Sequence, residues 1–406
     1  MTDHSPHALL LGLNNQDDCA AAPLASLLGQ PPLVPPEQVS RLRVMVTPEY
    51  LERLRGLARV LDTALRAIVA QYFRDERIRA VYGLPPELES ILQRASGQRY
   101  NPGFYRPDFV YDRDGQPRIC EIGARYPLNG WMISHLLDKI SAEPTERQPG
   151  YDAFLDALRE LHPSGSTSVI VHAREPGTEI FLLADELRRS GARFLQAHPF
   201  ELRCSGGQLR VRDQTVDQAI LEMDRSELSL LPPAVLTRLI ETGAYFNDVR
   251  TLILVHDKRV LAVLNQVSIM RDYLPAADYA VLQPFLIPTH IVSSQPEAEA
   301  LLQRPERLIA KLSSGGRGLG ARVRHACGEE EWRRLVLRQW SRYMFQDYIE
   351  QREFLDPASQ RRIRLVGMQL CRNGTSYGPG VFRGSDELVI NVHQRRGKLY
   401  STMVAA

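Results

Sequence analysis

The residues best suited to chemistry lie in a glycine-rich segment that follows a lysine. Lys311 ends a predicted strand, and the next nine residues hold two serines and four glycines. Glycines let a loop backbone approach an anion closely, and a lysine adds a point charge. No Gly-Lys-Ser or Gly-Lys-Thr sequence follows, so the Walker pattern is absent. Phosphate binding and a flexible hairpin turn are equally compatible with this loop. Its serine and glycine positions are Ser313, Ser314, Gly315, Gly316, Gly318 and Gly320.

A second charged set lies between Arg106 and Arg125. Residues 106–122 predict a hairpin whose turn contains Asp-Gly. If the register puts Asp108 and Glu121 on one face, the two carboxylates can share a magnesium ion, which prefers oxygen ligands. The two arginines would be forks for a carboxylate or phosphate. The plain alternative is an exposed charged edge, but Glu121 stands between apolar residues, which weighs against it.

Two weaker features complete the set. In residues 343–350, Gln346 and Asp347 interrupt an apolar strand, which suits a hinge whose backbone groups read an adenine edge. In residues 255–259, a predicted strand end leads into a helix and carries Lys258. Each segment taken alone fits ordinary structure better than it fits a site.

The order of these four features resembles the circularly permuted ATP-grasp ligases, the group of eukaryotic glutathione synthetase and glutathionylspermidine synthetase. The stretch Phe104–Asp108 followed by Glu121-Ile122 resembles the family segment that lies before the glycine-rich lysine loop. The likeness spans about residues 104–393. The ordered set carries it, since no single motif is specific.

The resemblance implies ATP and Mg²⁺ as cofactors and gives roles to individual residues. The implied metal ligands are Glu121, Asp108 and, from the next turn, Asn129. The implied catalytic cations are Arg106, Lys311 and Arg383. The implied nucleotide contacts are Lys258, Lys311, Ser313, Ser314, Gly315, Gly316, Gly318, Gln346, Asp347, Tyr348 and Ile349, with Glu350 or Glu353 at the ribose. The implied substrate contacts are Arg106, Arg125 and Asn391.

Two departures bear on the metal. Gly123 stands where the family's metal motif has asparagine, and Gly315 and Gly316 stand where its loop often has an acidic residue. The number of bound metal ions is therefore open. A chain with degraded magnesium ligands could bind ATP without turning it over.

The activity that the resemblance implies is amide-bond formation between a small, amino-acid-like carboxylate and an amine. It would proceed through an acyl phosphate and release ADP and phosphate. One alternative is a catalytically degraded, ATP-binding regulatory protein of the same fold. Another is a kinase that stops at a phosphorylated product.

The elements that must position these residues combine α/β and α+β patterns, and the resemblance implies a circularly permuted ATP-grasp fold. Residues 1–165 hold an irregular lead-in, a helix over 51–72 and the hairpin. Residues 166–255 alternate strands and helices, which predicts a doubly wound parallel sheet, a Rossmann-like pre-ATP-grasp subdomain. Residues 256–406 predict the ATP-grasp lid and core. Its predicted helices cover 258–267, 296–303 and 329–340, and its predicted strands 308–312, 343–349, 362–371, 387–393 and 399–404.

Composition narrows the class of protein. The 406 residues carry 50 basic and 48 acidic side chains, and this balance favours neither nucleic acid nor an anionic membrane as partner. No stretch approaches 18 uninterrupted apolar residues, so we expect no membrane span. Five scattered cysteines and the absence of a signal-peptide pattern predict reduced thiols in the cytoplasm. A homodimer is the default expectation.

Overall fold

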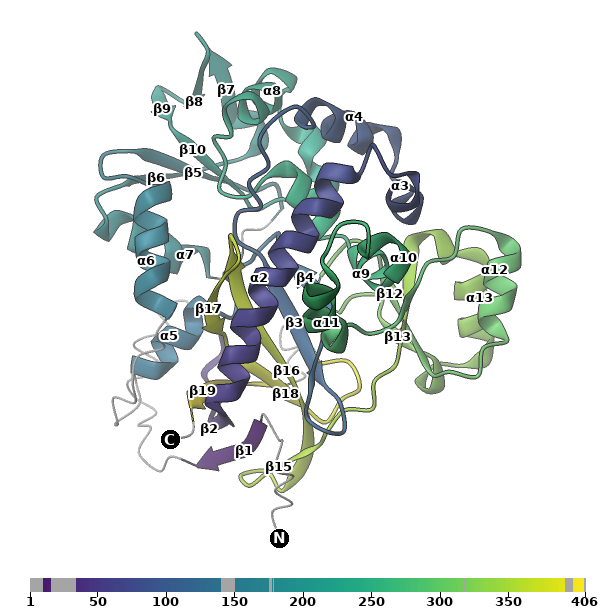
Figure 1. Cartoon of the computed structure of the whole chain (residues 1–406). Helices are drawn as coiled ribbons and strands as arrows, with labels where there is room; N and C mark the ends of the chain where they lie inside the picture. The colour runs from purple at the N-terminus through teal and green to yellow at the C-terminus, as the bar shows by residue number, and fades with distance from the viewer. Residues whose placement is uncertain are drawn as a thin grey trace.

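The computed structural model describes residues 10–15, 34–139, 150–174, 177, 179–316, 318–390 and 397–404. A nine-stranded sheet is the centre of this part of the chain, in the order β1-β2-β19-β18-β16-β3-β4, with β15 and β17 also paired to β16 (Figure 1). Only β2 and β19 pair in parallel. The strands are β1 (Leu10–Asn15), β2 (Val39–Val46), β3 (Arg106–Tyr111), β4 (Pro117–Gly123), β15 (Phe354–Asp356), β16 (Arg361–Arg372), β17 (Thr375–Pro379), β18 (Phe382–Ser385) and β19 (Lys398–Val404). The predicted hairpin of residues 106–122 is therefore confirmed.

The long helix α2 (Pro48–Gln71) packs against β16 and β17 of this sheet. Thr47 caps it, because its hydroxyl accepts the N–H of Tyr50 at 3.1 Å. Its leucines at 54, 57, 61 and 65 are buried, so the three- and four-residue spacing faces the core. The helix predicted over 51–72 is confirmed and begins one turn earlier.

A separate parallel sheet has the order β10-β5-β6. The strands are β5 (Thr167–Val171), β6 (Arg193–Ala197) and β10 (Gln218–Leu221), and the helices beside them are α6 (Gly150–Leu161), α7 (Ile180–Arg189) and α8 (Pro233–Thr242). Parallel pairing is confirmed, but the strand predicted at 252–255 is wrong. Residues Thr251–Val255 form a helical turn with every side chain buried. A short, wholly apolar run has no period that separates a buried strand from a buried helix.

The parallel sheet carries a small antiparallel extension that the sequence analysis did not predict. It consists of β7 (Leu202–Ser205), β8 (Gln208–Val211) and β9 (Gln214–Val216).

Residues 289–347 form a four-stranded antiparallel unit, order β11-β14-β12-β13, with its own core around Trp332 and Phe345. It lies at the right of Figure 1. Its elements are β11 (Thr289–His290), α12 (Gln295–Leu302), β12 (Leu308–Leu312), β13 (Arg322–Val323), α13 (Glu329–Arg338) and β14 (Tyr343–Asp347). The predicted strands and helices here are confirmed, although β14 ends two residues early.

In the described part of the strand predicted at 387–393, no strand is present. Residues 386–390 contain no strand, and 391–393 lie outside the described residues. The chain pairs earlier, as β18, where small and aromatic residues fit between β16 and β19.

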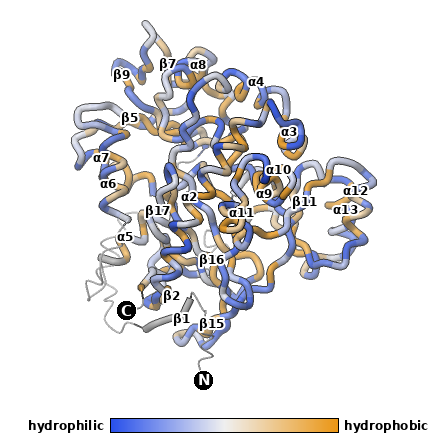
Figure 2. Tube along the Cα trace, in the orientation of Figure 1, coloured by the Kyte–Doolittle hydropathy of each residue, from blue (hydrophilic) through white to orange (hydrophobic). Residues whose placement is uncertain are grey.

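The remaining helices are short: α3 (Glu76–Tyr82), α4 (Pro86–Ala95), α5 (Met132–Lys139), α9 (Val260–Asn265), α10 (Val267–Met270) and α11 (Ala276–Leu282). The single helix predicted over 258–267 is thus two short ones. Figure 2 shows hydrophilic residues at the outer edges and hydrophobic residues toward the centre. No helix in the described ranges has the length and apolar character to cross a membrane. The four described cysteines are free thiols, as predicted.

Candidate functional site

The β3–β4 hairpin brings the predicted carboxylates onto one face. Asp108 is the direct cross-strand partner of Glu121, and Arg106 is the partner of Gly123. Directly opposed residues on antiparallel strands point to the same side. The register on which the sequence prediction depended is therefore the one that forms.

Asp108 lies between two guanidinium groups. Arg106 Nε donates to its Oδ1 at 2.7 Å and Arg106 Nη2 to its Oδ2 at 3.2 Å. Arg383 reaches over from β18 and donates through Nη2 to the same Oδ2. Asp108 is only 1% exposed, so both carboxylate oxygens are occupied by arginines inside the protein.

Glu121 lies among cations. Its Oε2 is 3.4 Å from Lys258 Nζ. Burial opposes ionisation of Glu121, but the positive charges of Lys258, Lys311, Arg383 and Arg106 outweigh it and lower the pKa of this carboxyl to about 2. Four of the predicted cations therefore lie near enough to the predicted carboxylate of Glu121 to stabilise its charged form.

Lys311 reaches into the same place from β12. Its Nζ donates to Cys120 O at 2.9 Å and to Gln346 Oε1 at 2.8 Å. Burial lowers the pKa of Lys311, and the nearby Glu121 acts in the opposite sense. The two contacts fix the ammonium group between the hairpin and β14.

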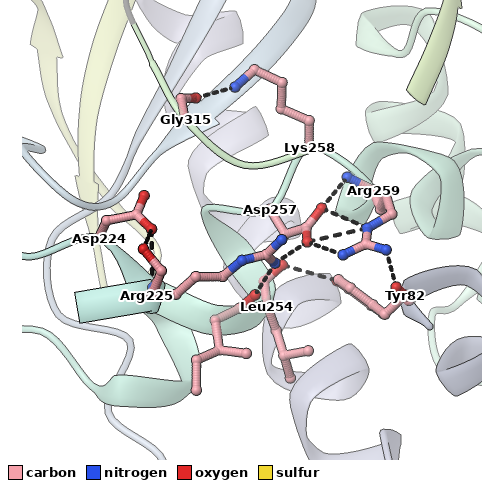
Figure 3. A network of polar contacts seen from close by, with 10 residues as sticks. Tyr82, Asp224, Arg225, Leu254, Asp257, Lys258, Arg259 and Gly315 are labelled. Atoms are coloured by element: carbon pink, nitrogen blue, oxygen red, sulfur yellow. Dashed lines mark hydrogen bonds and ion pairs between the residues drawn. The ribbon is translucent and has the colours of Figure 1, made fainter. Parts of the chain in front are cut away.

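Lys258 connects the site to the glycine-rich loop (Figure 3). Its N–H donates to Ser313 O at 2.9 Å, and its Nζ donates to Gly315 O at 2.6 Å. Both contacts hold the start of the loop against the turn that precedes α9. The predicted phosphate loop and the predicted first lysine are therefore brought together.

The neighbours of Lys258 form an ion-pair network that the sequence analysis missed (Figure 3). Asp257 accepts the N–H of Arg259 at 2.9 Å, its Nε at 3.0 Å and its Nη2 at 2.7 Å. Arg225 Nη1 donates to Oδ2 of the same carboxylate, which also accepts from Arg259 Nη2. An available signal was the Asp-x-Arg spacing, because Asp248 and Arg250 make the same backbone and side-chain bonds.

The glycine-rich loop borders a cavity of about 450 Å³. Gly320 has φ +72°, and a Cβ there would lie 2.9 Å from Leu312 Cδ1, so this position requires glycine. Gly315 also has positive φ, +102°, but a Cβ would meet open space. The cavity lining includes Gly318–Val323 and residues 387–389.

The predicted adenine hinge is only partly available. The N–H of Asp347 donates to Pro288 O at 2.9 Å and that of Tyr348 to Arg307 O at 2.7 Å. Gln346 is buried and held by Lys311 and by Thr289, to whose hydroxyl it donates at 3.2 Å. The backbone N–H groups of Asp347 and Tyr348 are therefore occupied within the protein and do not face a ligand. This corrects the prediction that they read an adenine edge. Ile349 stays a prediction.

Glu350 and Glu353, the predicted ribose contacts, pair with arginines instead. Glu350 accepts from Arg307 at 2.9 Å, and Glu353 accepts from Arg364 at 2.5 Å. They line a cavity of about 470 Å³ with Tyr348 and several arginines. Sugar hydroxyls would have to compete with those guanidinium groups.

The side chains of Asn129 and Arg125 have partners other than Asp108 and Glu121. Asn129 Oδ1 accepts the N–H of Glu179 at 3.2 Å, and Arg125 Nη2 is 3.3 Å from Glu227 Oε2. Asn391, the remaining predicted substrate contact, lies outside the described residues.

Two buried carboxylates in this neighbourhood were missed by sequence reasoning. Burial raises the pKa of Glu179 to about 7 and that of Glu222 to about 8, although backbone N–H donors act against the shift in both. Glu222 directly follows β10, and its carboxylate accepts the N–H of Gly177. Its place at the carboxyl end of a parallel strand was the available signal, since ligands bind at that edge in α/β sheets.

The three predicted magnesium ligands do not fit a shared ion as they lie. Arginines occupy both oxygens of Asp108, Asn129 Oδ1 is turned to the N–H of Glu179, and Lys258 is the neighbour of Glu121. In the described ranges no group of three His, Cys, Asp or Glu side chains could hold a metal ion. The donor set for the implied ion is thus reduced to Glu121.

Known structures resemble this arrangement in fold. The apo form of a glutathione synthetase-like effector from Globodera pallida superposes with a TM-score of 0.56 over 90% of each chain, at 10% sequence identity. The described chain therefore has a fold like that of this effector. At this identity the likeness concerns the fold alone.

The other structure comparison and the two sequence comparisons carry less weight. An ATP-grasp RimK domain protein from Sphaerobacter thermophilus DSM 20745 covers 58% of this chain and 89% of its own at 14% identity, with a TM-score of 0.29 that is too low to carry weight. The sequence model of the AnkG N-terminal domain matches residues 57–254, a little under half of the chain, and does not bear on an ATP-grasp fold. No curated protein matches the sequence.

Proposed function

We propose that this protein is an ATP-dependent ligase that joins a small, amino-acid-like carboxylate to an amine. The observation that carries the proposal is the gathering of four cations around the Asp108–Glu121 pair, beside a glycine-rich loop that Lys258 contacts. Lys258 contacts Glu121, Lys311 contacts Cys120 O, and Arg106 and Arg383 bind Asp108. These side chains come from four separate elements, so their meeting is a product of the fold and not of local sequence. An ATP-grasp-like fold supports nucleotide binding at this place.

In the proposed reaction, an oxygen of the substrate carboxylate attacks the γ-phosphorus of ATP. The bond from that phosphorus to the β,γ-bridging oxygen breaks, which releases ADP and leaves an acyl phosphate. The amine nitrogen then attacks the acyl carbon, loses a proton and expels phosphate. Carboxylate and triphosphate repel each other, and fixed cations offset that repulsion.

The residues of this chain divide the work by position. Lys311 and Lys258 lie next to the loop and are proposed to bind the phosphates. Arg106 and Arg383, which bind Asp108, are proposed to bind the acidic substrate. Closure of the loop over bound phosphates would exclude water that hydrolyses an acyl phosphate. Bound magnesium would supply further charge neutralisation, and Glu121 is the residue here that could hold it.

The test is a product assay with pooled substrates. Protein, ATP, magnesium and pooled amino acids are mixed with and without pooled amines, and ADP, AMP and phosphate are quantified. Substrate-dependent ADP and phosphate are expected, and Lys311→Ala should lower the rate about 10²-fold or more. Lys398→Ala, an exposed lysine on β19, is the matched control and should retain the wild-type rate. AMP as product would rule out the acyl phosphate.

A second candidate is an ATP-binding protein of this fold without catalysis. It is favoured by Gly123 and by the arginines that occupy Asp108, because both remove metal ligands. Tight nucleotide binding without ADP release from any pool would support it. Product formation that requires an acid but no amine would instead indicate a kinase.

A further inference from the structure

The two guanidinium groups that hold Asp108 differ in how they are satisfied. Arg106 is braced on several sides, because Nε and Nη2 bind Asp108 and Nη1 donates to Asn129 O. Arg383 has a bond to Asp108 through Nη2, while its Nε is buried and has no hydrogen-bond partner in the described part of the chain.

We infer that Asp108 is a positioning residue and not a metal ligand. Asp108 fixes the guanidinium of Arg383, which is the receptor for one oxyanion, and Arg106 holds Asp108 in place. The identity of that oxyanion, a substrate carboxylate or a phosphate, rests on the proposed function. The geometry of the three residues does not.

The unpartnered Nε points to the missing ligand. A guanidinium has five N–H donors in a planar fork, and a buried donor without an acceptor is costly. A carboxylate or phosphate oxygen beside Arg383 would accept from Nε and remove that cost. Because Asp108 already binds Nη2, it orients the plane of the fork before the anion arrives.

The place of a second metal ligand is filled by Arg106. Gly123 faces Arg106 across the hairpin, and a Cβ on residue 123 would lie 3.5 Å from Arg106 Nη2. A metal bound to Asp108 would have to displace a guanidinium from each of its two oxygens. The arrangement therefore suits anion binding by arginine better than metal binding by aspartate.

The experiment uses the full chain and measures the affinity for inorganic phosphate, for acetate and for the non-hydrolysable analogue AMP-PNP over a range of magnesium concentrations. Asp108→Asn should weaken binding of the oxyanion probe about tenfold, and Arg383→Gln at least as much. The magnesium concentration for half-maximal AMP-PNP binding should not change in Asp108→Asn. A higher magnesium requirement, with binding restored by excess magnesium, would make Asp108 a metal ligand and overturn the inference.

A double variant separates positioning from a general structural role. If Asp108 acts through Arg383, the combined Asp108→Asn and Arg383→Gln variant should bind the probe no more weakly than Arg383→Gln alone. Additive losses would contradict the inference. If Asp108→Asn does not fold, Arg383→Gln still tests the inference. Unchanged oxyanion affinity in Arg383→Gln would show that Arg383 is not the receptor.

The probes also separate this inference from the proposed function. Wild-type protein that binds no AMP-PNP would refute the proposed function, while phosphate or acetate binding lost in Arg383→Gln would still support the receptor. Phosphate binding that AMP-PNP abolishes assigns the receptor to the nucleotide. Acetate binding that AMP-PNP leaves intact assigns it to the acid substrate. Failure of the wild type to bind either small anion overturns the receptor.

Discussion

Asp108 and Asp257 are both buried aspartates held between two arginines, yet their surroundings differ. In the described part of the chain, every buried side-chain nitrogen and oxygen of Asp257, Arg225 and Arg259 has a hydrogen-bond partner. Around Asp108, the buried Nε of Arg383 lacks one. The first cluster is complete without a ligand, and the second is not.

The difference separates a structural charge cluster from a binding one. Burial and pairing alone do not identify a site, because both clusters have them. What distinguishes the Asp108 cluster is a donor that is left over after internal pairing. Asp257 lies beside Lys258 in the chain, so the complete cluster serves the site indirectly by fixing the backbone from which that lysine extends.

The largest predicted effect is the loss of the complete cluster. Asp257→Asn leaves two buried guanidinium groups without their carboxylate and should lower the free energy of unfolding by about 3–5 kcal/mol. Urea denaturation measures it. Asp213→Asn, at an exposed turn, is the matched control and should change stability little. Equal stability of Asp257→Asn and wild type would remove the contrast between the two clusters.

A buried carboxylate that forms no ion pair with an arginine in the described part of the chain provides the opposite test. Glu222 has a pKa raised to about 8 from an ordinary value of 4.5, so its ionisation disfavours the folded state. Its destabilising effect is absent below pH 4.5, grows as the pH rises toward about 8 and is then constant. Glu222→Gln should therefore stabilise the protein at pH 9 by on the order of 2 kcal/mol and have little effect at pH 4. Thermal unfolding at both pH values decides, and a stabilisation that does not depend on pH would contradict the assigned pKa.

The open cluster should contribute less to folding. Asp108→Asn is expected to lower the free energy of unfolding by about 1–2 kcal/mol, less than Asp257→Asn, because Arg106 keeps its bond to Asn129 O. At the same phosphate concentration, this variant should be stabilised less than the wild type. A loss as large as that of Asp257→Asn would mean that the two clusters do the same structural work.

The smallest effect is predicted for the arginines of the second cavity. Arg307 and Glu350 are 59% and 38% exposed, and exposed ion pairs contribute little. Arg307→Ala should change the free energy of unfolding by less than about 1 kcal/mol, and added salt should remove even that. A larger loss in urea denaturation would show that this arginine-rich rim is held together as firmly as the buried clusters.

Periodic segments of the chain could be predicted because their local spacing reports their buried face. This holds for α2, for the β3–β4 hairpin and for β12 with its loop. Val39–Val46 could not be recognised as a strand, because its pairing partner β19 lies at the other end of the sequence. Residues 252–255 failed for another reason, since an apolar run buried on all sides has no period to read.

The sequence predicted which residues form the candidate site better than it predicted the contacts among them. The chain has only four lysines among 50 basic residues, and two of them, Lys258 and Lys311, meet at Glu121. Their scarcity was a usable signal. The sequence could not reveal that Asp108 faces two arginines, because Arg383 comes from a strand 275 positions away. The role of Glu222 was hidden as well, since burial is a property of the whole fold.

The parallel pairing of β2 with β19 has a consequence for the order of folding on the ribosome. Residues 39–46 are among the first of the described chain to be synthesised, and 398–404 are the last. The middle of the large sheet therefore stays open until residues 398–404 have been made, whereas the parallel sheet of residues 167–221 can assemble from segments made earlier. Until then β2 presents an unpaired edge, and a chaperone that shields such edges would act on this segment while the residues between β2 and β19 are being made.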